Sequence, residues 1–301
     1  MKGHSMDLQT VLAGVKGTVR LHEPMSRHTS FRIGGPADAY VEPENVEALR
    51  LLMIQARQAK VPVFVMGGTN LLVRDGGLEG IVVRLTQLTR IQNLDEGMVY
   101  AEGGVSMPRL LQYAMRHGLT GLEFATGIPG TLGGAIVMNA GTHGGEMKDV
   151  VRRVQVVTTA GEVLELSSEE VGFDYRRSRL PQGVVVGAWL AVGHGDKAQI
   201  ESTVKGWLHR RKITQPIEMP NAGCVFKNLG GEPAGRLIEA AGLKGAQVGD
   251  AQVSTKHANF IVNRGHATAG DVLALIRLVG KTVEEKSGVT LELEVTIVGR
   301  A

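Results

Sequence analysis

The sequence has little cysteine, few aromatic residues and no long apolar run. A single cysteine, Cys224, among 301 residues excludes a disulfide framework and is typical of a cytoplasmic protein. No stretch reaches the roughly 18 uninterrupted apolar residues of a membrane helix, and no apolar leader segment is present, so we expect no membrane contact. Aromatic residues make up only 4% of the chain, which argues against a nucleic-acid surface with interleaved aromatics.

The charges are nearly balanced, and no metal-binding pattern occurs. There are 33 basic and 30 acidic residues, and the only basic cluster is His209 to Lys212. This balance favours a small anionic ligand, such as a phosphorylated substrate, over nucleic acid. No C-x-x-C, H-E-x-x-H or similar spacing is found, so the sequence predicts no metal site.

Glycine is the residue in excess, at 41 of 301, nearly twice the average share of about 7%. Many glycines in a chain without low-complexity repeats indicate tight turns and places where the backbone approaches a ligand closely. Short β-branched runs alternate with helical patterns, so an α/β or α+β fold is expected. We expect helices at 46–59, 106–118, 199–212, 233–241 and 270–286, a hairpin at 153–166, strands at 62–66, 81–83, 184–192, 258–262 and 290–298, and a loop at 219–228.

Two glycine-rich loops are candidates for binding a phosphate group. Gly67-Gly68-Thr69-Asn70 directly follows the expected strand at 62–66, where free N–H groups would suit a phosphate or pyrophosphate. A simple turn at the end of a strand explains the same residues. The second loop, 127–135, has neither the dinucleotide-binding spacing nor a Walker A lysine, so a structural loop is an equal alternative.

Three further segments carry chemistry-bearing side chains. Cys224 lies in a glycine-bounded turn beside Lys227 and Asn228, although a free cysteine is usually an inert buried residue. The alternation at 291–295 predicts Glu292 and Glu294 on one face of a strand, where solvent-facing carboxylates are the ordinary interpretation. The arginines at 176–179 form either a solvated turn or an anion clamp.

Together and in this order, seven segments resemble one family, the UDP-N-acetylenolpyruvoylglucosamine reductases, which are flavoenzymes of peptidoglycan synthesis. They span nearly the whole chain, at 28–37, 67–72, 128–135 with 138–141, 175–178, 220–228, 256–260 and 291–295. Each motif is modest, but seven in the family's order are specific. The short distance between Tyr175 and Lys212 is similar to the second subtype, which lacks an inserted loop with a tyrosine that clamps the substrate.

The resemblance implies an α+β fold with a two-part FAD-binding module of the vanillyl-alcohol-oxidase type and a C-terminal α+β substrate domain. By this resemblance we expect FAD-binding subdomain 1 at 1–85, joined by a returning C-terminal strand at 296–301. FAD-binding subdomain 2 is expected at 86–199, and the domain for the UDP-sugar at 200–295. A cytoplasmic monomer is expected.

The implied reaction reduces UDP-N-acetylglucosamine enolpyruvyl ether to UDP-N-acetylmuramate. NADPH gives hydride to FAD, flavin N5 gives hydride to substrate C3, and C2 takes a proton. Hydride addition builds an enolate, whose negative charge is stabilised by fixed positive charge and hydrogen-bond donors. By motif match Arg176 supplies the charge, and Glu294 lies nearby, protonated or sharing a proton so that it can donate. Cys224 matches the proton donor, where many members have serine.

The departure from serine is chemically tolerable, because a thiol with a pKa of about 8.5 is mostly protonated at neutral pH and is a stronger acid than an alcohol. The motif match also assigns ligand-binding residues. Those for FAD are Arg32, Gly67, Gly68, Thr69, Asn70, Leu71, Ile128, Pro129, Gly130, Gly133, Gly134 and Asn139. Those for the substrate are Tyr175, Lys212, Asn221, Gly223 and Asn228, with Lys212 and Asn228 at the diphosphate.

Two alternatives stay open. One is an FAD oxidase or dehydrogenase of the same flavin fold, which would not need the segment 220–228 or Glu294. The other is a non-catalytic protein that binds UDP-sugars, which would not need Arg176, Cys224 and Glu294 together. Bound flavin would separate an enzyme from a binding module.

Overall fold

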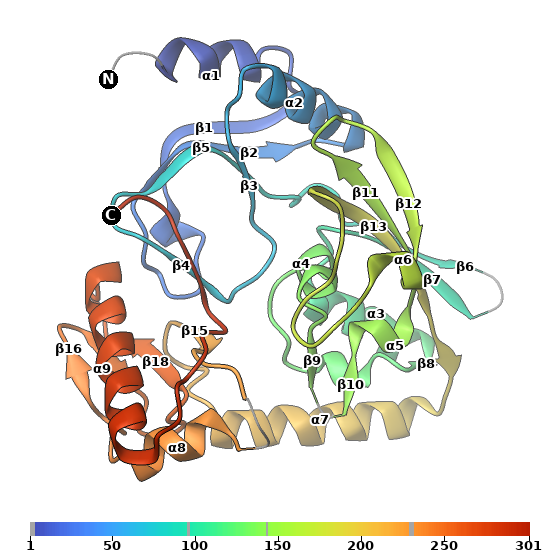
Figure 1. Ribbon diagram of the computed structural model, residues 1–301. Helices are drawn as coiled ribbons and strands as arrows, with labels where there is room; N and C mark the ends of the chain where they lie inside the picture. The colour runs from blue at the N-terminus through green and yellow to red at the C-terminus, as the bar shows by residue number, and fades with distance from the viewer. Residues whose placement is uncertain (1–3, 95–96, 143, 229–231) are drawn as a thin grey trace. The chain divides into compact units, whose positions relative to one another are not determined.

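The computed structural model describes residues 4–94, 97–142, 144–228 and 232–301 (Figure 1). The chain forms two compact units, each assembled from separate stretches. Unit 1 contains the residues up to 21, 39–68 and 80–208, and unit 2 contains 22–38, 69–79 and 209–301. The sequence predicts three domains with boundaries at 85, 199 and 295. The two units are made of separate stretches of the chain, so they do not test these boundaries, and the three domains stay a prediction.

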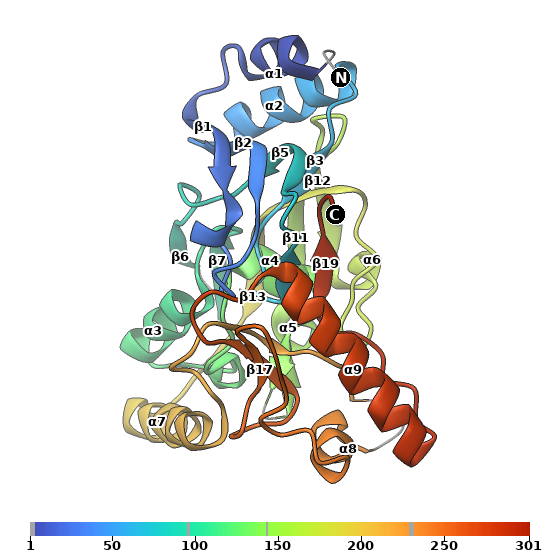
Figure 2. The ribbon, with the colours of Figure 1, turned by 90° about the vertical axis from the view of Figure 1, so that its left-hand side faces the viewer.

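The first sheet, which lies mainly in unit 1, has the strand order β1-β2-β5-β3. Its strands are β1 (Gly17–Pro24), β2 (Pro36–Pro43), β5 (Leu78–Val83) and β3 (Val63–Val65), and Figure 2 shows α1 (His4–Leu12) and α2 (Val46–Gln58) above them. Apolar side chains of α2, including Leu49 and Leu52, are buried against this sheet. The predicted helix at 46–59 and the strand at 81–83 are confirmed. The strand at 62–66 forms as β3 but is only half-buried, because it is the edge strand.

The second sheet of unit 1 is antiparallel, with the order β12-β11-β13-β7-β6. Its strands are β6 (Ile91–Leu94), β7 (Met98–Glu102), β11 (Val151–Thr158), β12 (Val163–Ser167) and β13 (Gly183–Ala191). The predicted hairpin at 153–166 is confirmed as β11 and β12. The helix α3 (Met107–His117) begins after Ser106, which caps Arg109 N, and ends at the left-handed Gly118, as the sequence predicts.

Short helices and strands lie between the longer elements of the chain. They are η1 (Met25–Arg27), β8 (Leu119–Thr120), η2 (Glu123–Ala125), α4 (Leu132–Val137), β9 (Gly141–Thr142), β10 (Gly145–Glu146), α5 (Met147–Val150), α6 (Ser168–Val171) and β14 (Gly193–His194). The long helix α7 (Lys197–Thr214) confirms the helix expected at 199–212; it begins in unit 1, and its residues from 209 on belong to unit 2.

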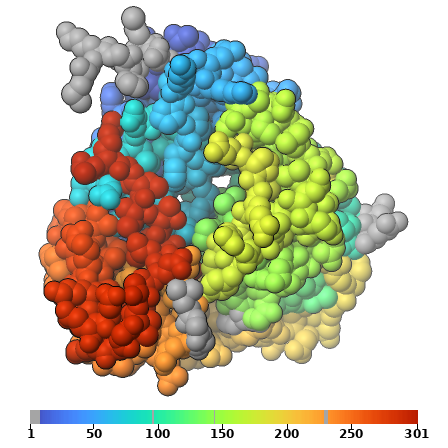
Figure 3. All heavy atoms as spheres, in the orientation of Figure 1, coloured from blue at the N-terminus to red at the C-terminus, as the bar shows by residue number. Residues whose placement is uncertain are grey.

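Unit 2 is built on a four-stranded sheet with the order β15-β18-β17-β16. The strands are β15 (Asn221–Cys224), β16 (Gln247–Val248), β17 (Ala251–Val253) and β18 (Phe260–Asn263). The helices α8 (Ala234–Ala240) and α9 (Ala269–Ser287) bury apolar side chains in the same core, and part of α9 is visible at the surface in Figure 3 (red). The capping box of Thr268 and Asp271 begins α9, as predicted.

Two expectations for unit 2 are wrong in detail. The expected loop at 219–228 contains the strand β15, because its residues pair with β18. The expected strand at 290–298 is a strand only in β19 (Thr296–Val298), which pairs in parallel with β4 (Leu71–Val73). Residues 291–295 form no regular strand. They are linked to residues 225–227 by separate backbone hydrogen bonds and one isolated bridge.

Candidate active site

In unit 1 the two predicted cofactor loops lie against each other. Thr131 N donates to Gly67 O at 2.9 Å, and the Thr131 hydroxyl donates to the same carbonyl at 3.2 Å. A Cβ at Gly134 would lie 2.5 Å from the carbonyl carbon of Gly67, and a Cβ at Gly130 would lie 2.8 Å from Gly67 O. Only glycine permits this approach, so the two loops form a surface of main chain that suits a ligand bound through backbone N–H groups.

Arg176 lies in unit 1 on a turn with a strained backbone. Its φ is +56°, a conformation that arginine rarely adopts. The half-buried guanidinium donates to Gly141 O at 3.2 Å and lies 5.1 Å from the ring centre of Tyr175, which is 46% exposed. The turn closes through the Asp174–Arg177 pair, in which the backbone N–H of each donates to the other's carbonyl. The ion pair with Arg177 lowers the pKa of Asp174, so its carboxylate stays charged.

Asn139 connects this turn to the segment 138–141. Its side chain is fully buried, its amide nitrogen donates to Asp174 O at 3.1 Å, and its amide oxygen accepts from Lys148 N at 3.0 Å. The predicted role of Asn139 in cofactor binding stays a prediction, since the structure shows its amide engaged with two protein segments. The amide is therefore placed to hold the turn of Arg176.

In unit 2 Cys224 ends the strand β15, and its side chain is partly exposed. The register of β15 against β18 shifts between Asn221 and Cys224. Gly223, between them, has a φ of +78°, which explains why glycine stands at this turn. The Asn221 side chain shapes the same turn: its oxygen accepts from Gly223 N at 2.9 Å, and its nitrogen donates to Pro216 O and Met219 O.

Glu294 lies beside the chain that follows Cys224. Glu294 N donates to Val225 O at 2.8 Å, and Lys227 N donates to Glu292 O at 2.8 Å. The alternation at 291–295 holds without a strand: Val295 is buried, Leu291 and Leu293 pack on the core, Glu292 is exposed and Glu294 is half-buried. Glu292 forms an ion pair with Lys227. Unit 2 therefore brings Cys224 and Glu294 onto adjacent segments.

The remaining predicted cofactor residues belong to unit 2. Arg32 is exposed and has a φ of +55°. The Ser30 hydroxyl donates to Thr69 O at 2.8 Å, which joins the loop of Arg32 to the end of the glycine turn. Asn70 O accepts from Thr296 N at 2.8 Å, and Leu71 is buried in β4. The predicted cofactor set is thus divided, with Arg32, Thr69, Asn70 and Leu71 in unit 2 and the others in unit 1.

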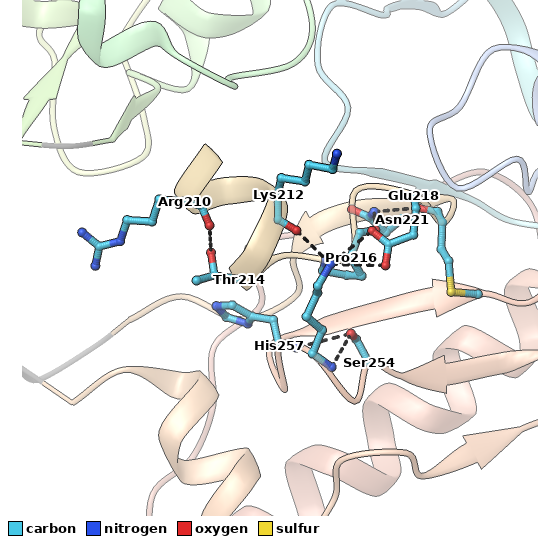
Figure 4. Close-up of polar contacts among 10 residues, drawn as sticks. Arg210, Lys212, Thr214, Pro216, Glu218, Asn221, Ser254 and His257 are labelled. Atoms are coloured by element: carbon cyan, nitrogen blue, oxygen red, sulfur yellow. Dashed lines mark hydrogen bonds and ion pairs between the residues drawn. The ribbon is translucent and has the colours of Figure 1, made fainter. Parts of the chain in front are cut away.

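The predicted residues for the substrate diphosphate lie at the end of α7 and after β15. Lys212 is exposed, and its carbonyl oxygen accepts from Lys256 Nζ at 2.9 Å. Figure 4 shows Lys212, Pro216, Glu218 and Asn221 around this end of the helix. Asn228 is exposed, and its side-chain oxygen accepts from Ala234 N at 3.0 Å at the start of α8.

One residue near Cys224 was missed from the sequence. Burial lowers the pKa of the Arg211 guanidinium, and the nearby Cys224 opposes this shift electrostatically. Arg211 lies within the basic cluster at 209–212, and no local signal in the sequence distinguishes it from its neighbours. Arg211 places a positive charge near Cys224.

Within the described residues, no three His, Cys, Asp or Glu side chains gather as a metal site requires. Likewise, none of the helices seen in residues 4–94, 97–142, 144–228 and 232–301 combines the length and apolar character that crossing a bilayer requires.

Comparison with known proteins decides the family. A model of the FAD binding domain matches residues 37–167, and the model of the UDP-N-acetylenolpyruvoylglucosamine reductase C-terminal domain matches 215–298. The enzyme named UDP-N-acetylenolpyruvoylglucosamine reductase 2 from Symbiobacterium thermophilum is 50% identical over 94% of this chain and 93% of its own length. A relative from Caldanaerobacter subterraneus subsp. tengcongensis is 48% identical over 94% of this chain and 95% of its own.

The chain belongs to the UDP-N-acetylenolpyruvoylglucosamine reductase family. A crystal structure of the reductase from Thermus caldophilus has a TM-score of 0.81 and 39% identity, and the alignment covers 94% of this chain and 99% of that one. Membership in the reductase family confirms the fold class, the FAD cofactor and the assignment as an oxidoreductase that the sequence predicted. NADPH is the usual reductant of these reductases.

Proposed function

We propose that this protein reduces the enolpyruvyl ether of UDP-N-acetylglucosamine to UDP-N-acetylmuramate, with NADPH as the reductant and FAD as the bound cofactor. The observation that carries the proposal is the pairing in unit 2, where Glu294 N donates to the carbonyl of Val225, the residue after Cys224. An acidic thiol and a carboxyl group on neighbouring segments are what protonation beside a carboxylate requires.

The residues of this chain fit FAD. The approach of Gly67 to Gly134 leaves main chain where a Cβ would otherwise intrude, and main-chain N–H groups suit a pyrophosphate. Gly67, Gly68, Gly130 and Gly133 would hold the cofactor with the other residues of the predicted set. When bound, FAD would supply the two-electron chemistry that carries hydride from NADPH to the enolpyruvyl group.

This chain supplies charge and a proton. Arg176 stabilises the negative charge that develops on the substrate carboxylate as C3 gains hydride. Glu294, protonated or sharing a proton, donates a hydrogen bond to the developing enolate. Cys224 Sγ gives its proton to C2, and the thiol is then restored by a proton from solvent. The Arg211 guanidinium lies near enough to Cys224 to interact with it electrostatically.

The substrate's diphosphate would be bound by Lys212, a point charge, and by the oriented amide of Asn228. Tyr175, Asn221 and Gly223 complete the proposed substrate set. Asn221 and Gly223 act by shaping the turn that presents Cys224, since the Asn221 side chain is bonded within that turn. A location in the cytoplasm, a monomeric state and the absence of nucleic-acid or membrane partners belong to the same proposal. Light scattering on the purified protein checks the monomer.

The visible spectrum of the purified protein, held anaerobic, tests the function. We expect NADPH to bleach the flavin absorbance and the enolpyruvyl ether to restore it. If NADPH bleaches the flavin but the ether never restores it, the substrate assignment is wrong and an oxidase or dehydrogenase of the same fold takes its place. If no flavin binds even after reconstitution with FAD, the enzyme proposal fails and a UDP-sugar-binding protein remains.

A further inference from the structure

Asn259, a buried residue, holds the segment 225–226 that follows Cys224 through hydrogen bonds. Asn259 is 2% exposed. Its amide oxygen accepts from Phe226 N at 2.9 Å, and its amide nitrogen donates to Phe226 O at 2.8 Å. Its own backbone carbonyl accepts from Val225 N at 2.9 Å. Three hydrogen bonds from one residue therefore fix the two residues that follow Cys224.

The strand ladder alone does not fix this segment. Cys224 pairs with Phe260, but the register shifts between Asn221 and Cys224, and β15 ends at Cys224. The Asn259 amide, with one donor and one acceptor facing Phe226, continues the pairing where the regular ladder stops. Both groups are buried, so an unpaired Phe226 N–H or C=O would be costly.

The segment 225–226 is also hydrogen-bonded to the backbone of Glu294. Val225 O, between Cys224 and the residue held by Asn259, accepts from Glu294 N at 2.8 Å. Moving 225–226 would therefore move Cys224 on one side and the backbone of Glu294 on the other.

We propose that Asn259 is a positioning residue that sets Cys224 and Glu294 relative to each other. This inference rests on the proposed function, in which those two groups complete the reduction of the ether. Asn259 acts through the backbone at 225–226, and its two amide atoms are occupied by Phe226.

The chain offers a matched control at Asn263, at the end of β18. It is also an asparagine and is 3% exposed. Its amide nitrogen donates to Phe31 O at 3.0 Å, and its oxygen accepts from Gly265 N and Ala267 N. Asn263 thus resembles Asn259 in type and burial and lies at the other end of β18, but its side chain bonds to other segments.

The experiment compares Asn259→Ser with Asn263→Ser in the flavin-loaded protein. NADPH should reduce the flavin of Asn259→Ser at the unchanged rate, whereas reoxidation by the ether should slow by about 10- to 100-fold, as expected for a misplacement near 1 Å. The second readout needs no turnover: the rate at which iodoacetamide alkylates Cys224, the single cysteine, is followed against pH. We expect this profile to shift in Asn259→Ser and to stay unchanged in Asn263→Ser.

The inference is overturned if the two variants reoxidise at the same rate with the same alkylation profile. It is also overturned if Asn259→Ser slows both half-reactions equally, because that describes a general loss of structure. If Asn259→Ser does not fold, Asn259→Asp takes its place: it keeps the shape but turns an oxygen toward Phe226 O, and the same split is expected. Should the wild type bind flavin but fail to reoxidise with the ether, the proposed function fails, and the alkylation profile still decides the role of Asn259.

Discussion

The turn of Arg176 in unit 1 and the segment of Cys224 in unit 2 are held in different ways. Beyond the backbone pair of Asp174 and Arg177, the Arg176 turn is held mainly by the buried Asn139 amide, which donates to Asp174 O; the Ser178 hydroxyl adds an exposed bond to Val137 O at 3.0 Å. The Cys224 segment depends on main chain and core, since Ala222, Val225 and Phe226 are buried and backbone bonds join it to 259 and 294.

This difference separates two kinds of substitution. In the Cys224 segment, replacing the reacting side chain leaves the backbone in place, so the loss should be confined to one chemical step. In the Arg176 turn, a change in a neighbouring side chain can move the charge itself. Two side chains are exceptions in unit 2: Asn221 shapes the turn before Cys224, and Asn259 pairs with Phe226 where the regular strand pairing ends.

The largest effect is expected at Cys224. Cys224→Ala removes the proton donor but leaves β15 and its pairing, so reoxidation of reduced flavin by the ether should slow by about 10²- to 10⁴-fold. Reduction by NADPH should be unchanged, because it needs no proton from Cys224. Cys224→Ser should stay active, as a hydroxyl can donate at the same position. Stopped-flow absorbance of each half-reaction measures this, and normal reoxidation in Cys224→Ala would show that another group is the donor.

A smaller effect is expected at Asn139, in the region held by side chains. Asn139→Asp keeps the shape and tolerates the φ of +42°, but it turns an oxygen toward Asp174 O. The turn should shift, and reoxidation by the ether should slow by about 10-fold, within the range for misplaced groups.

The control for Asn139 lies on the same turn. Ser178→Ala removes one exposed hydrogen bond, and its rates should change by about twofold or less. Equal rates in Asn139→Asp and wild type would contradict the role of Asn139 in holding the turn. If Asn139→Asp instead loses its bound FAD but reacts at the normal rates after FAD is added back, the result favours the predicted role of Asn139 in cofactor binding.

The same contrast explains what the sequence could predict. Local signals located the helix caps at Ser106 and Thr268 and the 153–166 hairpin, because these depend on residues close together in the chain. The alternation at 291–295 predicted the correct buried face but the wrong element, since its partners at 225–227 lie about 65 residues away. Arg211 and Asn259 were missed as site residues for the same reason: each acquires its role only through a contact that the fold creates.

A stability effect without a chemical one is expected at Asp75, in unit 2. Its two carboxylate oxygens accept from Ala269 N at 2.9 Å and Gly270 N at 3.0 Å, so a residue from the β4 region caps α9. Asp75→Asn loses one of these bonds and the favourable interaction with the helix dipole, which together should cost about 1 kcal/mol. The thermal midpoint should fall by about 1–2 °C, with both flavin half-reactions unchanged. Asp196→Asn, at the exposed start of α7, should lower it less, and the opposite order would show that the Asp75 cap contributes little.

The smallest effect is expected at His257, which is hydrogen-bonded to Asn259 and should make the stability of the folded protein depend on pH. Burial lowers the pKa of His257, and the Lys244 ammonium adds to this against the opposing charge of Glu239. Its Nδ1 accepts from Asn259 N at 3.2 Å, a bond that protonation would remove. Because the folded pKa lies below the unfolded value of about 6.5, the unfolded chain takes up the proton first. The stabilisation is therefore complete above the unfolded pKa and is lost as the pH falls through the folded pKa.

The urea midpoint should fall more between neutral and mildly acidic pH in wild type than in His257→Asn, which keeps an acceptor but does not titrate. Parallel pH profiles for the two proteins would mean that His257 does not couple protonation to the hold on the Cys224 segment.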